Sequence, residues 1–306
     1  MTNPYSYIRN GGIVTYKPKE ERKSWTSYSV SFPSVFLTQY LGNSGIAGEY
    51  YLPKGETRTP LVILVHGMGD RSVYPCRLIA HTLANSGIAS IILFLVFHKS
   101  RATEVIKKKY PNLSSDEWFE SYQLSVTDIR QVIDWSDSRP EIIRDKIALV
   151  GISFGGMVSS IAMGLDKRIK TGVLIVSGGN SEQITRHSLL LRWQYKHNEE
   201  EFRSNQKLYA QYLAEVEEEG FENVRPLKRS YLTDPMTFSR SLRGRPIMML
   251  NALWDEMIPR VATLEMWKAC GKPPLTWYPS THASIWLWYP LMGRRIRAFI
   301  KSALDC

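Results

Sequence analysis

Residues 149–160, LVGISFGGMVSS, set a lone serine, Ser153, between two glycines where an apolar strand pattern gives way to a helical one. Small residues on both sides indicate a turn too tight for side chains at Gly151 and Gly155. A sharp turn from a strand into a helix pushes one hydroxyl out over the edge of a sheet. The stretch therefore predicts a strand–turn–helix unit that presents Ser153 for chemistry.

Strand patterns alternate with helical patterns along most of the chain, and such alternation predicts a mostly parallel sheet with helices on both faces. The predicted strands of this α/β fold cover residues 61–65, 88–97, 146–150, 172–176, 246–250 and 275–278. The predicted helices cover residues 72–85, 114–135, 155–165, 260–269 and 289–304. Two shorter strand patterns, at residues 27–32 and 46–52, precede them and are expected to form an antiparallel edge.

Residues 178–243 interrupt this alternation. Charged and aromatic residues at helical spacing replace the apolar strands there, with acidic runs at residues 199–201 and 217–219. The segment is too long for an ordinary connection, so it predicts a mostly helical insertion. The expected organisation is a core domain of residues 1–177 and 244–306 that carries the insertion at 178–243.

Composition limits the classes of protein to which the chain can belong. It has 306 residues, 43% of them hydrophobic, which is enough to bury a large core. The formal net charge of +10 comes from lysines and arginines spread along the chain. Because no recognised nucleic-acid-binding module accompanies this charge, no nucleic-acid partner is expected. The most apolar run, residues 88–97, is about half as long as a bilayer span, so no membrane span is expected.

Cysteines, histidines and the N-terminus narrow the choice further. Three widely separated cysteines, Cys76, Cys270 and Cys306, predict a reducing compartment and no disulfide scaffold. The N-terminus has no secretory pattern, so a cytoplasmic location is expected. The six histidines are scattered, and neither a dinucleotide-binding pattern nor a P-loop occurs. We therefore expect no metal and no cofactor.

Several polar residues follow directly after the predicted strands, and ligands of open α/β sheets bind beyond the carboxyl ends of the strands. These residues are His66, His98, Ser153, Asp255 and His282. A serine is a poor nucleophile near neutral pH unless a base takes its proton and a third group orients that base. The chain order of serine, aspartate and histidine is the one expected on this kind of sheet.

At GISFGG, HGMG, DEMIP and the late histidine the chain resembles the α/β-hydrolase superfamily, and the resemblance covers nearly all of residues 46–304. It implies that Ser153 is the nucleophile, that His282 is the general base and then the acid, and that Asp255 orients His282. It also implies an oxyanion hole made by the backbone N–H groups of Met68 and Phe154. The HGMG loop departs from the longer HGGG type of one lipase-like branch and is closer to dienelactone-hydrolase-like and general carboxylesterase branches.

Alternative roles remain open for several of these residues. Asp255 could cap the helix that follows Pro259, and Glu256 beside it is a rival acid. His282 could be a surface histidine, although no other histidine follows a late strand. His66 could brace the oxyanion loop through hydrogen bonds instead of having a catalytic role.

Candidate substrate contacts lie near the same strand ends. They are His66, Gly67, His98, Arg101 and Trp254. Whether His98 and Arg101 touch substrate or only fix their loop stays open. The superfamily often carries a cap where this chain has its insertion, and the aromatic residues of the insertion suit either an apolar substrate pocket or the insertion's own core. Those aromatic residues are Trp193, Tyr195, Phe202, Tyr209 and Tyr212.

The resemblance implies a serine hydrolase that cleaves the carboxylic ester bond of a small molecule through an acyl-enzyme. A thioesterase, a peptidase or an amidase would use the same three residues. A member of the fold that binds a small molecule without turnover is a further alternative, because a fold does not guarantee a function.

Overall fold

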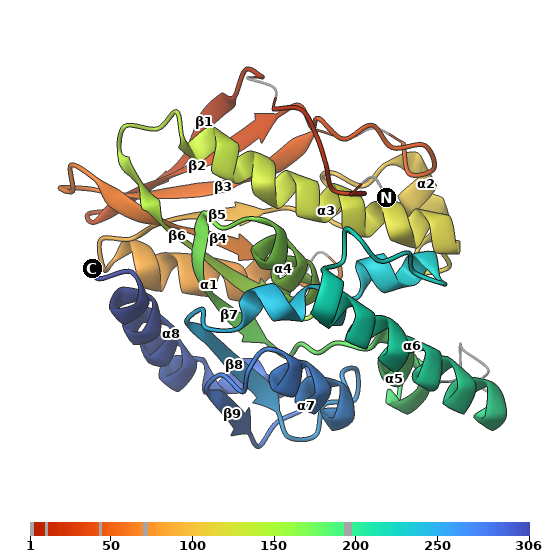
Figure 1. Ribbon diagram of the computed structural model, residues 1–306. Helices are drawn as coiled ribbons and strands as arrows, with labels where there is room; N and C mark the ends of the chain where they lie inside the picture. The colour runs from red at the N-terminus through yellow and green to blue at the C-terminus, as the bar shows by residue number, and fades with distance from the viewer. Residues whose placement is uncertain (1–2, 10–11, 43–44, 70–72, 193–197) are drawn as a thin grey trace.

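The computed structural model describes residues 3–9, 12–42, 45–69, 73–192 and 198–306. Within these residues, nine strands form one sheet in the order β1-β2-β3-β5-β4-β6-β7-β8-β9 (Figure 1). The strands are β1 (Thr15–Glu21), β2 (Trp25–Phe32), β3 (Ile46–Pro53), β4 (Thr59–Val65), β5 (Ala89–Leu93), β6 (Ile142–Ile152), β7 (Ile169–Ile175), β8 (Ile247–Ala252) and β9 (Leu275–Tyr278).

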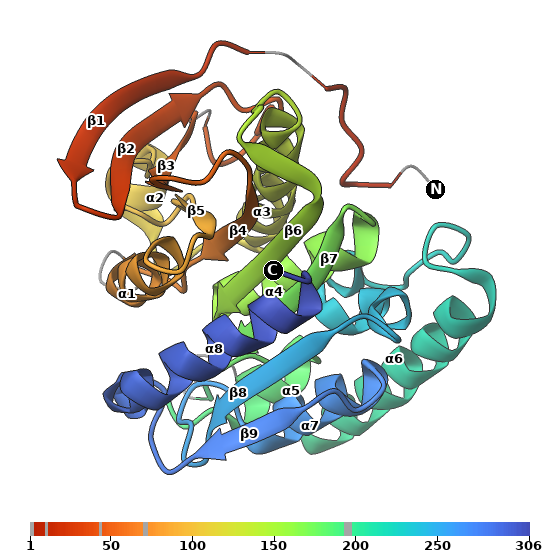
Figure 2. The ribbon, with the colours of Figure 1, turned by 90° about the vertical axis from the view of Figure 1, so that its left-hand side faces the viewer.

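Pairing within the sheet divides it into two parts. Strands β4 to β9 pair in parallel, whereas β1, β2 and β3 pair antiparallel and β3 joins β5 antiparallel. The antiparallel edge expected from the sequence is thus confirmed, and Figure 2 shows it beside the parallel strands. Every residue of the central strand β4 is buried, because parallel sheets are covered on both faces.

Helices cover both faces of this sheet. They are α1 (Val73–Ala84), α2 (Glu104–Lys109), α3 (Ser115–Ser136), α4 (Phe154–Leu165), α5 (Ser181–His187), α6 (Glu199–Glu219), α7 (Arg260–Ala269), α8 (Tyr289–Ala303) and the 3-10 helices η2 (Arg229–Thr233), η3 (Pro235–Leu242) and η4 (Ser284–Trp288).

The two faces have separate cores because alternate residues of each strand point to opposite sides. Val62 and Leu64 of β4 pack with α1 and α8 on one face, while Ile63 and Val65 pack with α3 and α4 on the other. The views in Figures 1 and 2 show α1 and α8 together on one side of the sheet. The α/β-hydrolase fold expected from the sequence is confirmed by this arrangement.

Two differences between the sequence expectations and the structure have a clear physical reason. The predicted strand at residues 88–97 ends at Leu93, and the apolar residues after it form a turn in which His98 N–H donates to Leu95 O at 2.9 Å. Residues 94–97 are apolar because they are buried in the loop after β5, and not because they pair with another strand of the sheet. Strand β1 was not predicted, because its residues TYKPKEE are partly or fully exposed at the sheet edge and lack apolar alternation.

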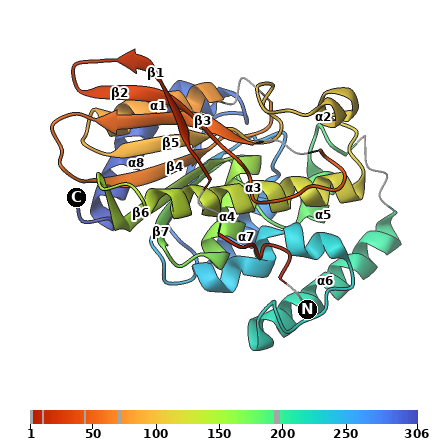
Figure 3. The same ribbon diagram turned by 90° about the horizontal axis from the view of Figure 1, so that it is seen from above.

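The segment 178–243 contains α5, α6, η2 and η3, and its described residues include no strand. Helix α6 lies at the periphery of the molecule (Figures 1 and 3). Its side chains form a small core with η2 that includes Tyr209, Tyr212 and Tyr231. The helical character of the segment agrees with the sequence pattern, while its role as a separate cap remains a prediction.

Candidate active site

Ser153 lies in a strained turn between β6 and α4. Its backbone has φ 55° and ψ −120°, and its N–H donates to Ile175 O at 2.8 Å. A non-glycine residue with positive φ is uncommon and persists only where its surroundings enforce it. The neighbouring glycines allow the close approach: a Cβ on Gly155 would lie 2.2 Å from Val65 O, and one on Gly151 would lie 2.5 Å from Gly155 O.

The structure brings the three residues predicted from strand ends into one line of hydrogen bonds. His282 Nε2 lies 3.0 Å from Ser153 Oγ, and His282 Nδ1 lies 2.9 Å from each carboxylate oxygen of Asp255. A carboxylate only accepts hydrogen bonds, so Nδ1 carries the proton and Nε2 is left to accept from the serine hydroxyl. The side chain of Asp255 is 3% exposed and that of His282 is 18% exposed, which leaves the imidazole within reach of a ligand.

The contacts of Asp255 and Glu256 bear on the alternatives considered for these two acids. Asp255 Oδ1 accepts hydrogen bonds from the N–H groups of Met257 (2.9 Å) and Ile258 (2.8 Å), so the same carboxylate closes the turn before α7 and binds the imidazole. Glu256 Oε2 instead accepts from the main-chain N–H of His282 at 2.9 Å. Of the two acids, Asp255 is therefore the one that contacts the imidazole.

The N–H groups of Phe154 and Met68, which are expected to form an oxyanion hole, lie at the start of α4 and in the loop after β4. Phe154 is the first residue of α4, and the first N–H groups of a helix have no acceptor within the helix. Its ring is held edge-on by Tyr122 and Phe97, with ring centroids 4.8 Å and 5.4 Å away, which fixes the start of the helix. Met68 lies partly buried in the loop after β4, and residues 70–72 of that loop are outside the described residues.

His66 has the geometry of a brace. It is fully buried, its Nε2 accepts from Leu95 N–H at 2.9 Å, and its Nδ1 lies 2.6 Å from Gly67 O. Because Nε2 accepts, Nδ1 must donate, so the ring is neutral and both nitrogens bond to backbone. His66 thus ties the oxyanion loop to the loop after β5, and the geometry favours the bracing role over substrate contact for this residue. Gly67 is buried beside it.

His98 and Arg101 are both largely buried in the loop after β5. The His98 ring stacks on Phe94 with centroids 4.1 Å apart, and its Nδ1 lies 2.6 Å from Ser100 Oγ. Arg101 donates to Phe94 O at 2.8 Å and forms an ion pair with Asp128 of α3, in which both side chains are at most 1% exposed. These contacts fix the loop. His98 as a residue is 8% exposed, and a substrate contact by it stays a prediction.

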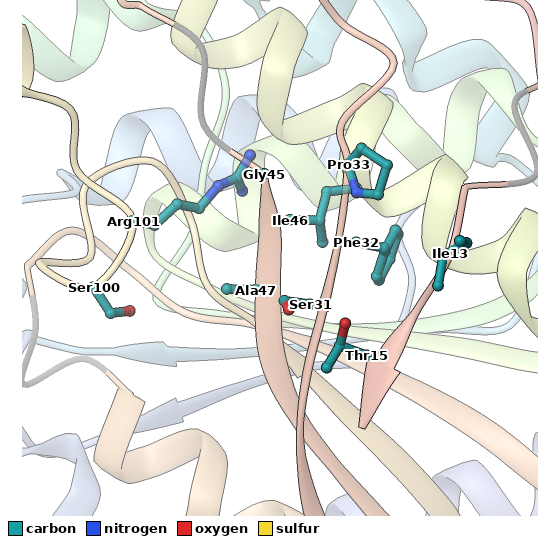
Figure 4. Close-up of a pocket in the computed structure, with 10 residues that line it drawn as sticks. All are labelled: Ile13, Thr15, Ser31, Phe32, Pro33, Gly45, Ile46, Ala47, Ser100 and Arg101. Carbon is teal, nitrogen blue, oxygen red and sulfur yellow. The ribbon is translucent and has the colours of Figure 1, made fainter. Parts of the chain in front are cut away.

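A pocket of about 420 Å³ lies beside this loop. It is bounded by strand ends at the antiparallel edge, and Figure 4 shows Ser100 and Arg101 at one side of it. Its lining consists of Ile13, Thr15, Ser31, Phe32, Pro33, Gly45, Ile46, Ala47, Ser100 and Arg101. Ser153, Asp255 and His282 are not among these residues, so the pocket is separate from the hydrogen-bonded line that they form.

Trp254 and the aromatic residues of the insertion lie in different surroundings. The Trp254 side chain is 61% exposed beside Asp255, and its main-chain N–H donates to Ser280 O at 3.0 Å, which joins the aspartate and histidine loops. Tyr209 and Tyr212 are buried in the core of the insertion, with exposures of 5% and 3%. The ring of Phe202 packs against α5, and Trp193 and Tyr195 lie outside the described residues.

Two further observations concern metal ions and membranes. Among the described residues, no three histidine, cysteine, aspartate or glutamate side chains are grouped in a way that could hold a metal ion. Within the same part of the chain, every helix is too short or too polar to serve as a membrane-spanning segment.

Two contacts near the candidate site are beyond the reach of sequence reasoning. Glu256 binds the main chain of His282, and Asp128 pairs with Arg101, across separations of 26 and 27 residues. No local spacing marks either pair. Glu256 and His282 lie in two different loops, and Arg101 lies in a loop while Asp128 lies in α3, so only folding brings the partners together.

Known proteins resemble the chain in sequence and in fold. An uncharacterized protein of Mycobacterium tuberculosis (strain CDC 1551 / Oshkosh) is 26% identical over 311 residues, a match that covers 96% of this chain and 67% of the relative. The acetyl xylan esterase from Paenibacillus sp. R4 superposes with a TM-score of 0.67 at 18% identity, covering 96% of this chain and 89% of the other.

A second solved structure has the same fold. Acetyl xylan esterase 1 from Thermoanaerobacterium sp. JW/SL YS485 gives a TM-score of 0.61 at 13% identity, covering 97% and 91% of the two chains. At such identities the likeness demonstrates the fold alone. The family model for alpha/beta hydrolase domain containing 18 matches residues 9–287. The chain is therefore a member of this family within the α/β-hydrolase superfamily.

Proposed function

We propose that the protein is a serine hydrolase that cleaves carboxylic ester bonds of small molecules through an acyl-enzyme on Ser153. The observation that carries the proposal is the line of hydrogen bonds from Ser153 Oγ through His282 to Asp255. The esterase names of the two solved structures with the same fold support it. An intact line of this kind has no evident use in a protein that only binds.

In the first half of the reaction, His282 Nε2 takes the proton of Ser153 Oγ as the oxygen attacks the carbonyl carbon of the ester. Asp255 holds Nδ1–H and stabilises the imidazolium that forms. The tetrahedral oxyanion accepts hydrogen bonds from the N–H groups of Phe154 and Met68. Each such donor typically contributes about 3 kcal/mol to transition-state stabilisation. The C–O bond to the alcohol then breaks, and Nε2–H protonates the leaving alkoxide.

In the second half, a water replaces the alcohol. His282 Nε2 removes a proton from this water as its oxygen attacks the acyl carbon, and the bond from carbon to Ser153 Oγ breaks with return of the proton to Oγ. The products are the free acid and the starting enzyme. The insertion at 178–243 is proposed to act as the cap over this site, since Ser188 Oγ and Leu189 N–H at the end of α5 each donate to Glu256 O at 2.9 Å.

The test is turnover of p-nitrophenyl esters of increasing chain length, with a matched thioester and p-nitroanilide. We expect ester hydrolysis that falls at least about 10³-fold in kcat for Ser153→Ala and His282→Ala. Ser302→Ala, at an exposed position of α8, is the control and should match the wild type.

Each outcome of this panel has a meaning. Preference for the thioester or the anilide would replace the ester assignment while keeping the mechanism. Equal rates for wild type and Ser153→Ala, or no turnover of any substrate by the wild type, would contradict the enzyme assignment.

A further inference from the structure

Glu256 contacts the site and the insertion at the same time. Its carboxylate oxygen Oε2 accepts from the main-chain N–H of His282 at 2.9 Å. Its main-chain carbonyl accepts from Ser188 Oγ and from Leu189 N–H, both at 2.9 Å. The residue is thus anchored by the end of α5 while its side chain reaches across to the histidine loop.

His282 lies in a short loop, and its main-chain N–H is bound from outside that loop by Glu256. The loop runs from β9 to η4 and is closed by hydrogen bonds between Thr281 and Ser284, with N–H of Thr281 donating to Ser284 Oγ at 2.8 Å. The ring is held at Nδ1 by Asp255. Its Nε2 also lies 3.0 Å from Ser153 Oγ. A side chain moves with its main chain, so both ring contacts, at Nδ1 and at Nε2, depend on where the main chain of His282 lies.

We propose that Glu256 is a positioning residue that fixes the main chain of His282 so that Nε2 faces Ser153 Oγ. The adjacent acids then hold one histidine at two points, Asp255 at the ring and Glu256 at the backbone. Because Ser188 and Leu189, which directly follow α5, hold the Glu256 carbonyl, the insertion sets the position of His282 through the same residue. This inference rests on the proposed function, since it assigns a role within the same reaction.

The contact requires a hydrogen-bond acceptor and not a negative charge, because its partner is a neutral peptide N–H. Glu256→Gln keeps an acceptor oxygen at the same reach. Glu256→Met keeps the length and the apolar stem without a comparable acceptor, and Glu256→Ala removes the whole side chain. These three variants separate the hydrogen bond from charge and from packing.

The experiment measures kcat and KM of full-length wild type and variants on the best p-nitrophenyl ester. We expect kcat of Glu256→Met and Glu256→Ala to fall about 10- to 100-fold with KM within about twofold, since small misplacement of a catalytic group is costly. Glu256→Gln should stay within about threefold of the wild type. Glu215→Ala, on the exposed side of α6, is the matched control and should be unchanged.

Proton NMR supplies a readout that a merely structural role would not move. The low-field resonance of the proton between His282 Nδ1 and Asp255 should persist in Glu256→Gln and broaden or vanish in Glu256→Met. Circular dichroism reports whether each variant is folded. If Glu256→Ala does not fold, the resonance in Glu256→Gln and Glu256→Met still tests the proposal.

Three outcomes would overturn the inference. They are a Glu256→Met variant with wild-type kcat, an equal loss in Glu256→Gln and Glu256→Met, or an unchanged low-field resonance in Glu256→Met. The proposed function fails separately, when Ser153→Ala retains the wild-type rate. Loss of turnover in Ser153→Ala with full activity in Glu256→Met would reject the positioning role alone.

Discussion

At the scale of single residues, the site depends on a backbone conformation that its surroundings impose. Ser153 has a positive φ, which costs of order 1–3 kcal/mol, and the packed ends of β6 and α4 hold it there. The same packing places Gly155 against the carbonyl groups of Val65 and His66. The glycines of the motif are therefore a steric requirement of the turn that exposes the Ser153 hydroxyl.

Gly155→Ala should destabilise the fold and displace the nucleophile. Its Cβ would lie 2.2 Å from Val65 O and 2.5 Å from His66 O, and both are backbone atoms that cannot move aside cheaply. We expect a loss of about 3 kcal/mol or more, measured by urea unfolding. The control is Gly220→Ala, where no atom lies within 4 Å but φ is +86°, so the cost should be only about 1 kcal/mol. Equal costs at the two positions would contradict the steric account.

The residues of the site differ in how far the sequence could predict them. Ser153 was predictable from its local pattern, because the glycines and the change from strand to helix are adjacent in the chain. Predicting Asp255 and His282 as site residues required the order of the strands along the chain and the family resemblance as well. The partners of Arg101 and of the His282 main chain were beyond prediction, because burial and side-chain reach decide them.

At the scale of elements, polar side chains join the antiparallel edge to the core. Glu49 of β3 is 4% exposed at its side chain and pairs with Arg77 of α1 and Lys19 of β1, and Tyr51 donates to it at 2.8 Å. Burial raises the pKa of Glu49, but the hydrogen bonds from Arg77, Lys19 and Tyr51 outweigh it and lower the pKa to about 2. These bonds tie β1, β3 and α1 together.

The depressed pKa of Glu49 predicts a specific loss of stability in acid. An unfolded glutamate binds its proton near pH 4.5, whereas folded Glu49 resists protonation down to about pH 2. The stabilisation is therefore complete above pH 4.5 and disappears as the pH falls toward 2. Glu49→Gln should cost about 2 kcal/mol at pH 7, allowing for solvent screening of its partners, and should flatten the slope of unfolding free energy between pH 5 and 3.

Urea unfolding of wild type and Glu49→Gln across that range checks the prediction. Glu218→Gln, on the exposed side of α6, is the control and should keep the wild-type slope. Parallel curves for wild type and Glu49→Gln would show that this carboxylate does not carry the acid response.

At the scale of the whole molecule, the alternation of strands and helices predicts a mostly parallel sheet with helices on both faces, and the family resemblance supplies the α/β-hydrolase fold. Buried parallel strands such as β4 are continuous apolar runs, and the sequence predicts where they lie, although β6 extends over Ile142–Ile152 where residues 146–150 are predicted. The edge strand β1 was missed because exposure removes the apolar signal, and β5 was predicted too long because buried loops are also apolar. What the sequence lacked was information on which apolar residues pair in the sheet.

The central claim is that folding makes Ser153 a nucleophile through His282 and Asp255. It is tested most directly by reaction with a fluorophosphonate, followed by intact mass and peptide mapping. We predict one adduct, located on Ser153, that is absent in Ser153→Ala and forms far more slowly in His282→Ala. Absence of an adduct in the wild type, or an adduct that persists in Ser153→Ala, would contradict the claim.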